Sequence, residues 1–578
     1  MQHPIGDHAL LADGRTAALV DPDGNIAWLC WPRIDSAPCL LSILDDVVGG
    51  CFRVAPVDEA ARVVERGYVP GTLILRTVWR VGGDELVVLD ALACDGEPRL
   101  LRSLHARGRV EVAVTVALAP DAARAAVEPR AHGAALRIAG GGIDIAVHAP
   151  AQWTVDDGGV AECRLWVDSS DCAVAFGNTT GSSPFGSLDG TRRWFAEKLP
   201  AASTLTPNQL SGTTLGDSTA RRMLAQSAAV LAALRQRGGG IVAAPTTSLP
   251  QWPGSARTWD YRYSWLRDTS LAGLGMLAAG LVDDAAGLGD FLGDATSAMP
   301  PAVLLRVDGT APPPEHTLDH LRGYRGARPV RVGNAAAEQP QLDVAGEILE
   351  FAAALAERDV LPPSLRDGVV RIADWTADHW TQADHGIWEI RGPARHYTHS
   401  RVAAWAGLEH AAALAEKGVV HGDVARWRRT AEAIRAGVLG IDGALTLHDT
   451  GGGPDAALAQ AILFGLLEEG DARRYATIET IVAGLDRGGL IDRHLAGEDS
   501  LGDPCAPFLF PTFWVAEALQ LCGRDGSRYF AAAAASRGPL DLFGEVADPT
   551  HHTPLGNYPQ VQSHAAFIIA ATDPGVSH

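Results

Sequence analysis

The hydrophobic pattern of this 578-residue chain changes period near residue 216, and this change limits what the chain can fold into. Before that point apolar residues alternate with other residues, as at Val110, Val112, Val114, Val116 and Leu118. Successive side chains of a strand point to opposite faces, so a period of two predicts half-buried strands. After residue 216 apolar residues recur every three or four positions, which is typical of amphipathic helices. We therefore predict a β domain followed by a helical domain.

Two segments of the first part have a strand–turn–strand pattern. Alternating residues at 73–81 are followed by the turn Gly82-Gly83-Asp84 and by ELVVLDAL (85–92). ALRIAGGGIDIAVHA (135–149) has glycines at its centre in the same way. Many short strands joined by glycine-rich turns predict an antiparallel β-sandwich, which we assign to residues 1–215.

The second part begins with one long helical face, formed by Leu224, Ala228, Leu231 and Leu234. We assign residues 216–240 to a linker helix and residues 241–578 to a further domain of helices with long loops. About 340 residues accommodate roughly twelve helices. An (α/α)6 barrel, a closed double ring of helices, fits that number, although periodicity alone does not distinguish it from a helical solenoid.

Charge and cysteine content narrow the function classes. The chain has 48 Lys and Arg against 69 Asp and Glu, a formal net charge of −21, which argues against nucleic acid or an anionic membrane as the main partner. The start has no basic segment followed by an apolar one, and no apolar run approaches the ~20 residues that span a bilayer. The eight cysteines include no CxxC pair. We expect a cytoplasmic protein with reduced thiols, and neither a metal nor a cofactor.

One loop segment, ARTWDYRYSWLRDTSLAG (256–273), is rich in aromatic and charged residues. Its aromatic residues precede the pair Arg267–Asp268. Aromatic rings beside a carboxylate and a guanidinium suit a sugar, whose C–H face stacks on the ring while its hydroxyl groups form hydrogen bonds. The alternative is a core aromatic cluster that buries an Arg–Asp pair.

Two glutamates are candidates for acid–base chemistry. Glu389 stands between Trp388 and Ile390, and apolar surroundings would raise its pKa and let it donate a proton near neutral pH. The alternative for Glu389 is an ion pair with Arg391. Glu545 stands in the loop segment 540–567, where the alternative is a turn acid without a catalytic role.

Three motifs resemble glycoside hydrolase family 15, in its bacterial glucoamylase/trehalase-like branch. They are WDYRYSWLRD (259–268), GIWEIRG (386–392) with PARHYTHS (393–400), and GEVADP (544–549) with LGNYPQ (555–560). The likeness covers nearly the whole chain. It implies an N-terminal β-sandwich and a C-terminal (α/α)6 barrel, whose loops bind the non-reducing end of an α-glucoside.

Carried over residue by residue, the resemblance implies that Glu389 is the general acid and Glu545 the general base. It also implies that Arg267 and Asp268 hold the hydroxyl groups of the terminal glucose. The remaining substrate-binding residues that we expect are aromatic: Tyr263, Trp265 and Trp388.

An inverting glycosidase uses one protonated carboxyl and one ionised carboxylate, ~6.5–9.5 Å apart, so that water fits beside the sugar. We expect Trp388 and Ile390 to desolvate Glu389, and a wetter loop to keep Glu545 ionised. The resulting hypothesis is an exo-acting inverting α-glucoside hydrolase that acts on a disaccharide or a small oligosaccharide. The candidate substrates are α,α-trehalose, α-1,4 oligomers such as maltose, and α-1,6 oligomers. A homodimer is one candidate assembly.

Three alternatives remain. A phosphorylase on the same barrel would replace the activated water by phosphate and would not need Glu545. A non-catalytic sugar-binding protein would keep the aromatic pocket. A metal enzyme would use His396 with His399, or His551 with His552, but neither pair has a third-ligand pattern.

Two departures from the family pattern concern the leaving-group side of the pocket. Val546 follows Glu545 where relatives commonly have a second acid. Pro504, Cys505 and Pro507 interrupt the segment 492–514.

Overall fold

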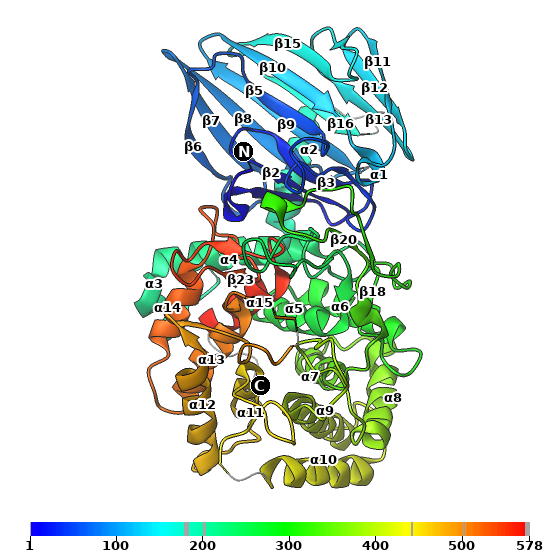
Figure 1. Ribbon diagram of the computed structural model, residues 1–578, viewed down its shortest axis with the longest axis vertical. Helices are drawn as coiled ribbons and strands as arrows, with labels where there is room; N and C mark the ends of the chain where they lie inside the picture. The colour runs from blue at the N-terminus through cyan, green and yellow to red at the C-terminus, as the bar shows by residue number, and fades with distance from the viewer. Residues whose placement is uncertain are drawn as a thin grey trace.

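The computed structural model describes residues 2–96, 98–177, 184–199, 204–440, 443–499, 501–502 and 504–572. A β part and a helical part lie one above the other (Figure 1). Strands fill the first part up to residue 177, and helices dominate after residue 204. The predicted order, an N-terminal antiparallel β domain followed by a helical domain, is confirmed.

Two antiparallel sheets form the β-sandwich. One has the order β14-β15-β10-β5, and the other has the order β11-β12-β13-β16-β9-β8-β7-β6. Strands β10 and β15 of the first sheet contact β8 and β9 of the second. The strands are β5 (Cys51–Pro56), β6 (Arg62–Tyr68), β7 (Leu75–Val81), β8 (Asp84–Leu92), β9 (Arg99–Arg107), β10 (Val110–Ala117), β11 (Glu128–His132), β12 (Ala135–Gly140), β13 (Ile143–His148), β14 (Thr154–Val155), β15 (Ala161–Val167) and β16 (Cys172–Gly177).

Both predicted hairpins are present. Val81 of β7 lies opposite Asp84 of β8, so the turn is Gly82-Gly83. Gly140 of β12 lies opposite Ile143 of β13. Burial alternates residue by residue along β10, as a strand with one face on the core requires.

A third sheet lies between the sandwich and the helices. It has the order β1-β2-β3-β4, with bounds β1 (Ala9–Ala12), β2 (Ala17–Val20), β3 (Ile26–Cys30) and β4 (Pro38–Leu40). Its strand β3 and the loop after it bond to loops of the helical part. The Trp28 indole donates to the carbonyl of Pro245 at 2.8 Å, and the Arg262 guanidinium donates to the carbonyl of Ser36 at 2.8 Å. The β part therefore supports the loops that precede α5.

The helices form a closed double ring. Contacts run from α5 to α7, α9, α11, α13 and α15, and α15 returns to α5, which excludes an open solenoid. These inner helices are α5 (Leu266–Ala278), α7 (Asp343–Glu357), α9 (Thr398–Glu416), α11 (Gln460–Leu463), α13 (Leu509–Leu521) and α15 (Val561–Ala571). The outer helices are α4 (Asp217–Leu234), α6 (Val282–Ala295), α8 (Pro363–His379), α10 (Val424–Leu439), α12 (Ala472–Leu485) and α14 (Ser527–Ala535).

The segment between the two domains also contributes to this packing. Helix α2 (Pro184–Lys198) contacts β8, β9 and β16, and α3 (Gln209–Leu215) contacts α4, α14 and α15. The helix that the sequence predicts as a linker over residues 216–240 is α4, and it packs on α15 and α5.

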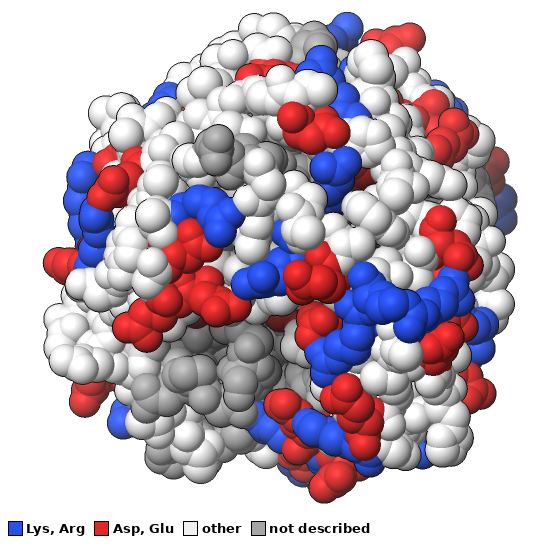
Figure 2. Space-filling view, turned by 90° about the horizontal axis from the view of Figure 1, so that it is seen from below, with Lys and Arg blue, Asp and Glu red and all other residues white. Residues whose placement is uncertain are grey.

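Seen from the end where α10 lies, acidic and basic side chains are interspersed (Figure 2). Several are paired, as Arg426 with Asp378 and Arg435 with Glu468. Within the described part of the chain, every helix is too short or too polar to cross a bilayer.

Candidate active site

A pocket lies where the N-terminal ends of inner helices meet. Helices α5, α7, α9, α13 and α15 place side chains there through their first turns or the loops before them. The pocket-lining residues from these positions include Trp265, Arg267 and Asp268 at α5, Trp388, Glu389 and Arg391 before α9, Phe508 and Phe510 at α13, and Gln560 and Gln562 at α15.

Glu389 projects from a strained turn. Its φ is +56°, a left-handed conformation that residues other than glycine rarely adopt, and its N–H donates to the carbonyl of Gly386. Such strain persists where the surroundings determine the conformation, and it is concentrated at functional sites. One carboxyl oxygen, Oε1, accepts bonds from Trp265 Nε1 at 2.6 Å and Arg267 Nη2 at 3.0 Å. The turn and these bonds hold the carboxyl in the pocket.

Trp388 and Ile390, which we expect to desolvate Glu389, line the same pocket, but other segments supply the donors that bind its carboxyl. The Trp388 indole donates instead to Asp455 at 2.8 Å, and its ring packs near Phe508 and Phe510. Trp265, immediately before α5, and Arg267, in its first turn, hold the carboxyl. The alternative partner, Arg391, pairs with Glu315. The sequence therefore predicted neither the bonds from Trp265 and Arg267 to Glu389 nor the ion pair of Arg391 with Glu315.

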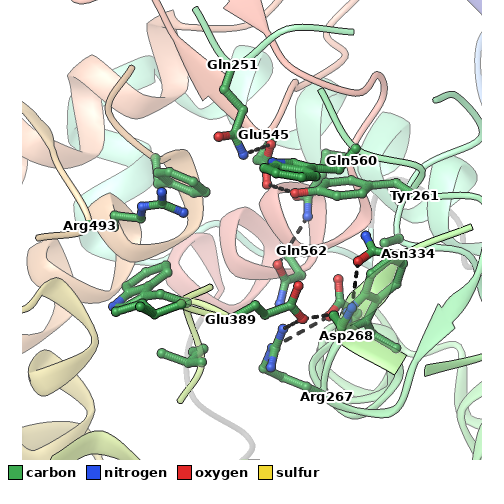
Figure 3. Close-up of a pocket in the computed structure, with 18 of the residues that line it drawn as sticks. Gln251, Tyr261, Arg267, Asp268, Asn334, Glu389, Arg493, Glu545, Gln560 and Gln562 are labelled. Atoms are coloured by element: carbon green, nitrogen blue, oxygen red, sulfur yellow. Dashed lines mark hydrogen bonds and ion pairs between the residues drawn. The ribbon is translucent and has the colours of Figure 1, made fainter. Parts of the chain in front are cut away.

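Glu545 lies at the other side of the pocket (Figure 3). Its Oε1 accepts a bond of 2.6 Å from the Tyr261 hydroxyl, and its Oε2 accepts one of 2.9 Å from Gln251 Nε2. The predicted wet loop is wrong, because Glu545 is only 5% exposed. Burial raises its pKa, against the effect of the bonds from Tyr261 and Gln251 and of the nearby Arg493.

Arg267 and Asp268 line the pocket and form a buried pair, with 3.7 Å between Arg267 Nε and Asp268 Oδ2. The arginine also donates to Gln341 at 2.8 Å and contacts Asp343 at 3.3 Å. Burial, together with the charges of Glu389 and Glu545, raises the pKa of Asp268 to about 7, against the attraction of Arg267. Arg267 and Asp268 therefore form the buried pair of one interpretation and also line the pocket, as the other interpretation requires.

Only some of the predicted aromatic residues line the pocket. Trp265 and Trp388 line it, and so does Tyr261. Tyr263 does not. Its hydroxyl donates to Asp260 Oδ2 at 3.2 Å and accepts the N–H of Gly333. Asp260 is buried with Arg262, so the Tyr263 hydroxyl bonds to this ion pair and not to a residue of the pocket lining.

Several pocket residues were missed from the sequence. Gln251 lies 294 positions from its partner Glu545, and no local pattern marks it. Arg493, Asp499 and Leu501 come from the segment 492–514, whose departure from the family pattern was the available signal. Ser500 and Asp503 of that segment lie outside the described residues. The Asp499 carboxylate pairs with both Arg257 and Arg493.

The remaining sequence candidates have other partners. His399 bonds to Gln460. His551 contacts Asp548 at 3.3 Å, and His552 contacts Ser536 at 3.0 Å. His396 is likewise outside the pocket lining. The described residues contain no group of three or more His, Cys, Asp and Glu side chains that could hold a metal ion.

Comparisons with known proteins give a consistent result. A family model described as glycosyl hydrolases family 15 matches residues 218–522, and one described as trehalase-like, N-terminal, matches residues 1–188. A trehalase of Mycobacterium tuberculosis is 32% identical over 610 residues, covering 98% of this chain and 89% of that protein. A trehalase of Mycolicibacterium smegmatis is 31% identical over 614 residues, covering 98% and 90%.

Among solved structures, a bacterial glucoamylase complexed with acarbose superimposes with a TM-score of 0.71 at 13% identity. The match covers 98% of this chain and 94% of that one. At this identity the likeness concerns the fold, and it identifies the double ring as the glucoamylase type of (α/α)6 barrel.

Proposed function

Because the chain belongs to glycoside hydrolase family 15, we propose that it is an exo-acting inverting hydrolase whose substrate is α,α-trehalose. Membership of the family makes the protein a glycoside hydrolase. The choice of trehalose is supported by relatives named trehalase, which align with almost the full length of the chain. One observation above all supports the choice of mechanism. Glu389 and Glu545 line the same pocket, and each is bonded to different hydrogen-bond donors.

In the proposed reaction Glu389 donates its proton to the oxygen that bridges the two glucose units. The bond from this oxygen to C1 of the bound non-reducing glucose breaks, and one glucose leaves with its α configuration intact. Glu545 takes a proton from a water molecule, whose oxygen attacks C1 from the opposite face. The products are one β-glucose and one α-glucose. Each carboxyl ends in the other's initial protonation state, and solvent exchange restores both.

The surrounding residues support these roles. Tyr261 and Gln251 each bond one oxygen of Glu545, which fixes the orientation of the carboxylate toward water. Arg267 and Asp268 offer paired donors and acceptors for the hydroxyl groups of the non-reducing glucose. A phosphorylase would not need a base for water, so the buried and doubly bonded Glu545 favours hydrolysis.

Proton NMR of the protein with trehalose, read within minutes, tests the proposal. We expect α-glucose and β-glucose in equal initial amounts. Initial α-glucose alone would mean retention and would make Glu545 a nucleophile. Glucose 1-phosphate formed only with added phosphate would mean a phosphorylase. Cleavage of maltose or isomaltose but not trehalose would move the substrate to another α-glucoside.

A further inference from the structure

Two guanidinium groups lie over the ring of Trp259 in the wall of the pocket. Arg391 Cζ is 4.1 Å from the ring centroid, and Arg331 Cζ is 4.2 Å from it. Trp259 and Arg391 line the pocket, whereas Arg331 does not. Arg331 donates instead to the carbonyl of Ala256 and the hydroxyl of Thr258. Arg391 is therefore the cation of this cluster that faces the substrate space.

Glu315 fixes the orientation of Arg391. Its two oxygens accept one bond each from Arg391 Nη1 and Nη2, the former at 2.9 Å. The backbone N–H of Ala335 donates to the same carboxylate at 3.1 Å. Glu315 follows three prolines at 312–314 and precedes β19 (His316–Thr317), which pairs with β20 (Arg331–Val332). A planar group stacked on one side chain and paired with another has little freedom left, so its unused donors have defined directions.

Arg391 also lies on a defined side of the reaction. It is two residues from Glu389, and the acid must reach the bridging oxygen from the side of the leaving sugar. Among the described residues, Glu315 is the one hydrogen-bond partner of its guanidinium, and the side chain is 31% exposed. The guanidinium thus offers its remaining N–H groups at the mouth of the pocket.

We propose that Arg391 binds hydroxyl groups of the leaving glucose, with Trp259 and Glu315 as its positioning residues, and so selects a sugar as the leaving group. This inference rests on the proposed function, because it assigns the second half of the same substrate. A guanidinium fork suits two neighbouring hydroxyl oxygens, which accept parallel N–H bonds. The site would then require a leaving group with adjacent hydroxyls.

Comparison of two substrates tests this assignment. α,α-Trehalose has a sugar as leaving group, whereas α-D-glucosyl fluoride places glucose in the same reacting position and releases only fluoride. We expect Arg391→Ala to lower kcat/KM for trehalose about 10- to 100-fold, the effect of losing charged hydrogen bonds. Turnover of the fluoride should change less than about twofold. Arg391→Lys should lose nearly as much on trehalose, because an ammonium lacks the fork.

Glu315→Gln keeps the size of the side chain but removes the charge that orients Arg391. It should lower kcat/KM for trehalose less than Arg391→Ala does, and should leave turnover of the fluoride unchanged. Arg435→Ala, which removes an outer ion pair with Glu468, is the matched control and should leave both rates unchanged. Equal losses on both substrates, or none on trehalose, would overturn the assignment. A wild-type protein that cleaves neither substrate would overturn the proposed function itself. Inhibition by 1-deoxynojirimycin, which fills the glucose position alone, should be unchanged in Arg391→Ala.

Discussion

Glu389 and Glu545 carry the same functional group but have different neighbours. Glu389 contacts an indole and a guanidinium and is 23% exposed at its side chain. Glu545 is buried and bonded to a phenol and an amide. Two carboxyl groups in one pocket can take different catalytic roles only when their surroundings differ. Here the difference comes from α5 and the segment between α4 and α5, which supply all four of these partners.

Removal of the base should be partly reversible by an added nucleophile. We expect Glu545→Ala to lose about 10²–10⁴-fold in turnover of trehalose, the usual contribution of a general base. Azide needs no deprotonation and fits the space left by the side chain, so it should restore part of the rate with α-glucosyl fluoride as substrate. The product should be β-glucosyl azide, identified by NMR. An α-glucosyl azide would contradict inversion.

The hydrogen bond from Tyr261 should set the acidic limb of the pH–rate profile. Glu545 must be ionised to act as the base, so activity is lost as pH falls through its pKa, which burial has already raised. The phenol bond lowers this pKa. We therefore expect Tyr261→Phe to move the acidic limb of kcat/KM to higher pH.

Tyr263→Phe is the matched control for this shift. It removes a similar hydroxyl two residues away, but one bonded to Asp260 rather than to Glu545. Its acidic limb should coincide with that of the wild type. An unmoved limb in Tyr261→Phe would mean that another group controls the limb.

At the scale of elements, the inner ring depends on close approach of its helices. Helices α7 and α9 meet at Gly346 and Gly407, where a Cβ on Gly407 would lie 2.7 Å from Gly346 Cα. A Cβ on Gly346 would lie 2.1 Å from the carbonyl oxygen of Ala403. Backbone cannot move aside as a flexible side chain can. The two glycines therefore set the spacing of helices whose N-terminal ends hold Asp343 and His399.

Gly346→Ala should lower the free energy of unfolding by about 1–3 kcal/mol, because the added methyl group overpacks the ring. Gly437→Ala in the outer helix α10 is the control, since its added Cβ meets nothing within 4 Å. There alanine should stabilise by about 0.4–1 kcal/mol through helix propensity. Urea unfolding followed by circular dichroism measures both. Equal effects of the two substitutions would contradict close packing at Gly346.

At the scale of the whole molecule, the sheet β1-β2-β3-β4 and the segment before it hold the loops that reach the pocket. Trp28 is fully buried and bonds to the carbonyl of Pro245, six residues before Gln251. Tyr558, between Glu545 and Gln562, donates its hydroxyl to the carbonyl of Gly6 at 3.2 Å. Residues more than 200 positions apart thus share one interface. The described residues of the β part support the site and are not among those that line it.

Trp28→Phe should lower the unfolding temperature in scanning calorimetry, because it leaves the buried Pro245 carbonyl without its donor, at a cost of about 1–3 kcal/mol. Trp166→Phe is the control, because Trp166 is 56% exposed on β15 and the same change there should have little effect. A Trp28→Phe protein as stable as the wild type would mean that the interface does not depend on this bond.

Much of the architecture could be predicted because it depends on neighbours in sequence. The alternation along 75–81 and 110–117 follows from the geometry of a strand. The turn at Gly82-Gly83 follows from the backbone geometry that a hairpin requires. The helical period after residue 216 follows from 3.6 residues per turn. The closure of the double ring could not be predicted from local pattern alone, because it is a contact between α5 and α15, almost 300 residues apart.

The sequence by itself determined the two folding classes, the order of the domains, and the family, through motifs that carry Glu389, Glu545, Arg267 and Asp268. Only the tertiary structure decided the surroundings of these residues. In the folded chain Glu545 is buried, Tyr261 lines the pocket in place of the predicted Tyr263, and Arg391 pairs with Glu315. The physical reason is one of distance along the chain: periodicity reports which face of an element is apolar, whereas the environment of a carboxyl depends on groups that only folding brings within hydrogen-bonding reach.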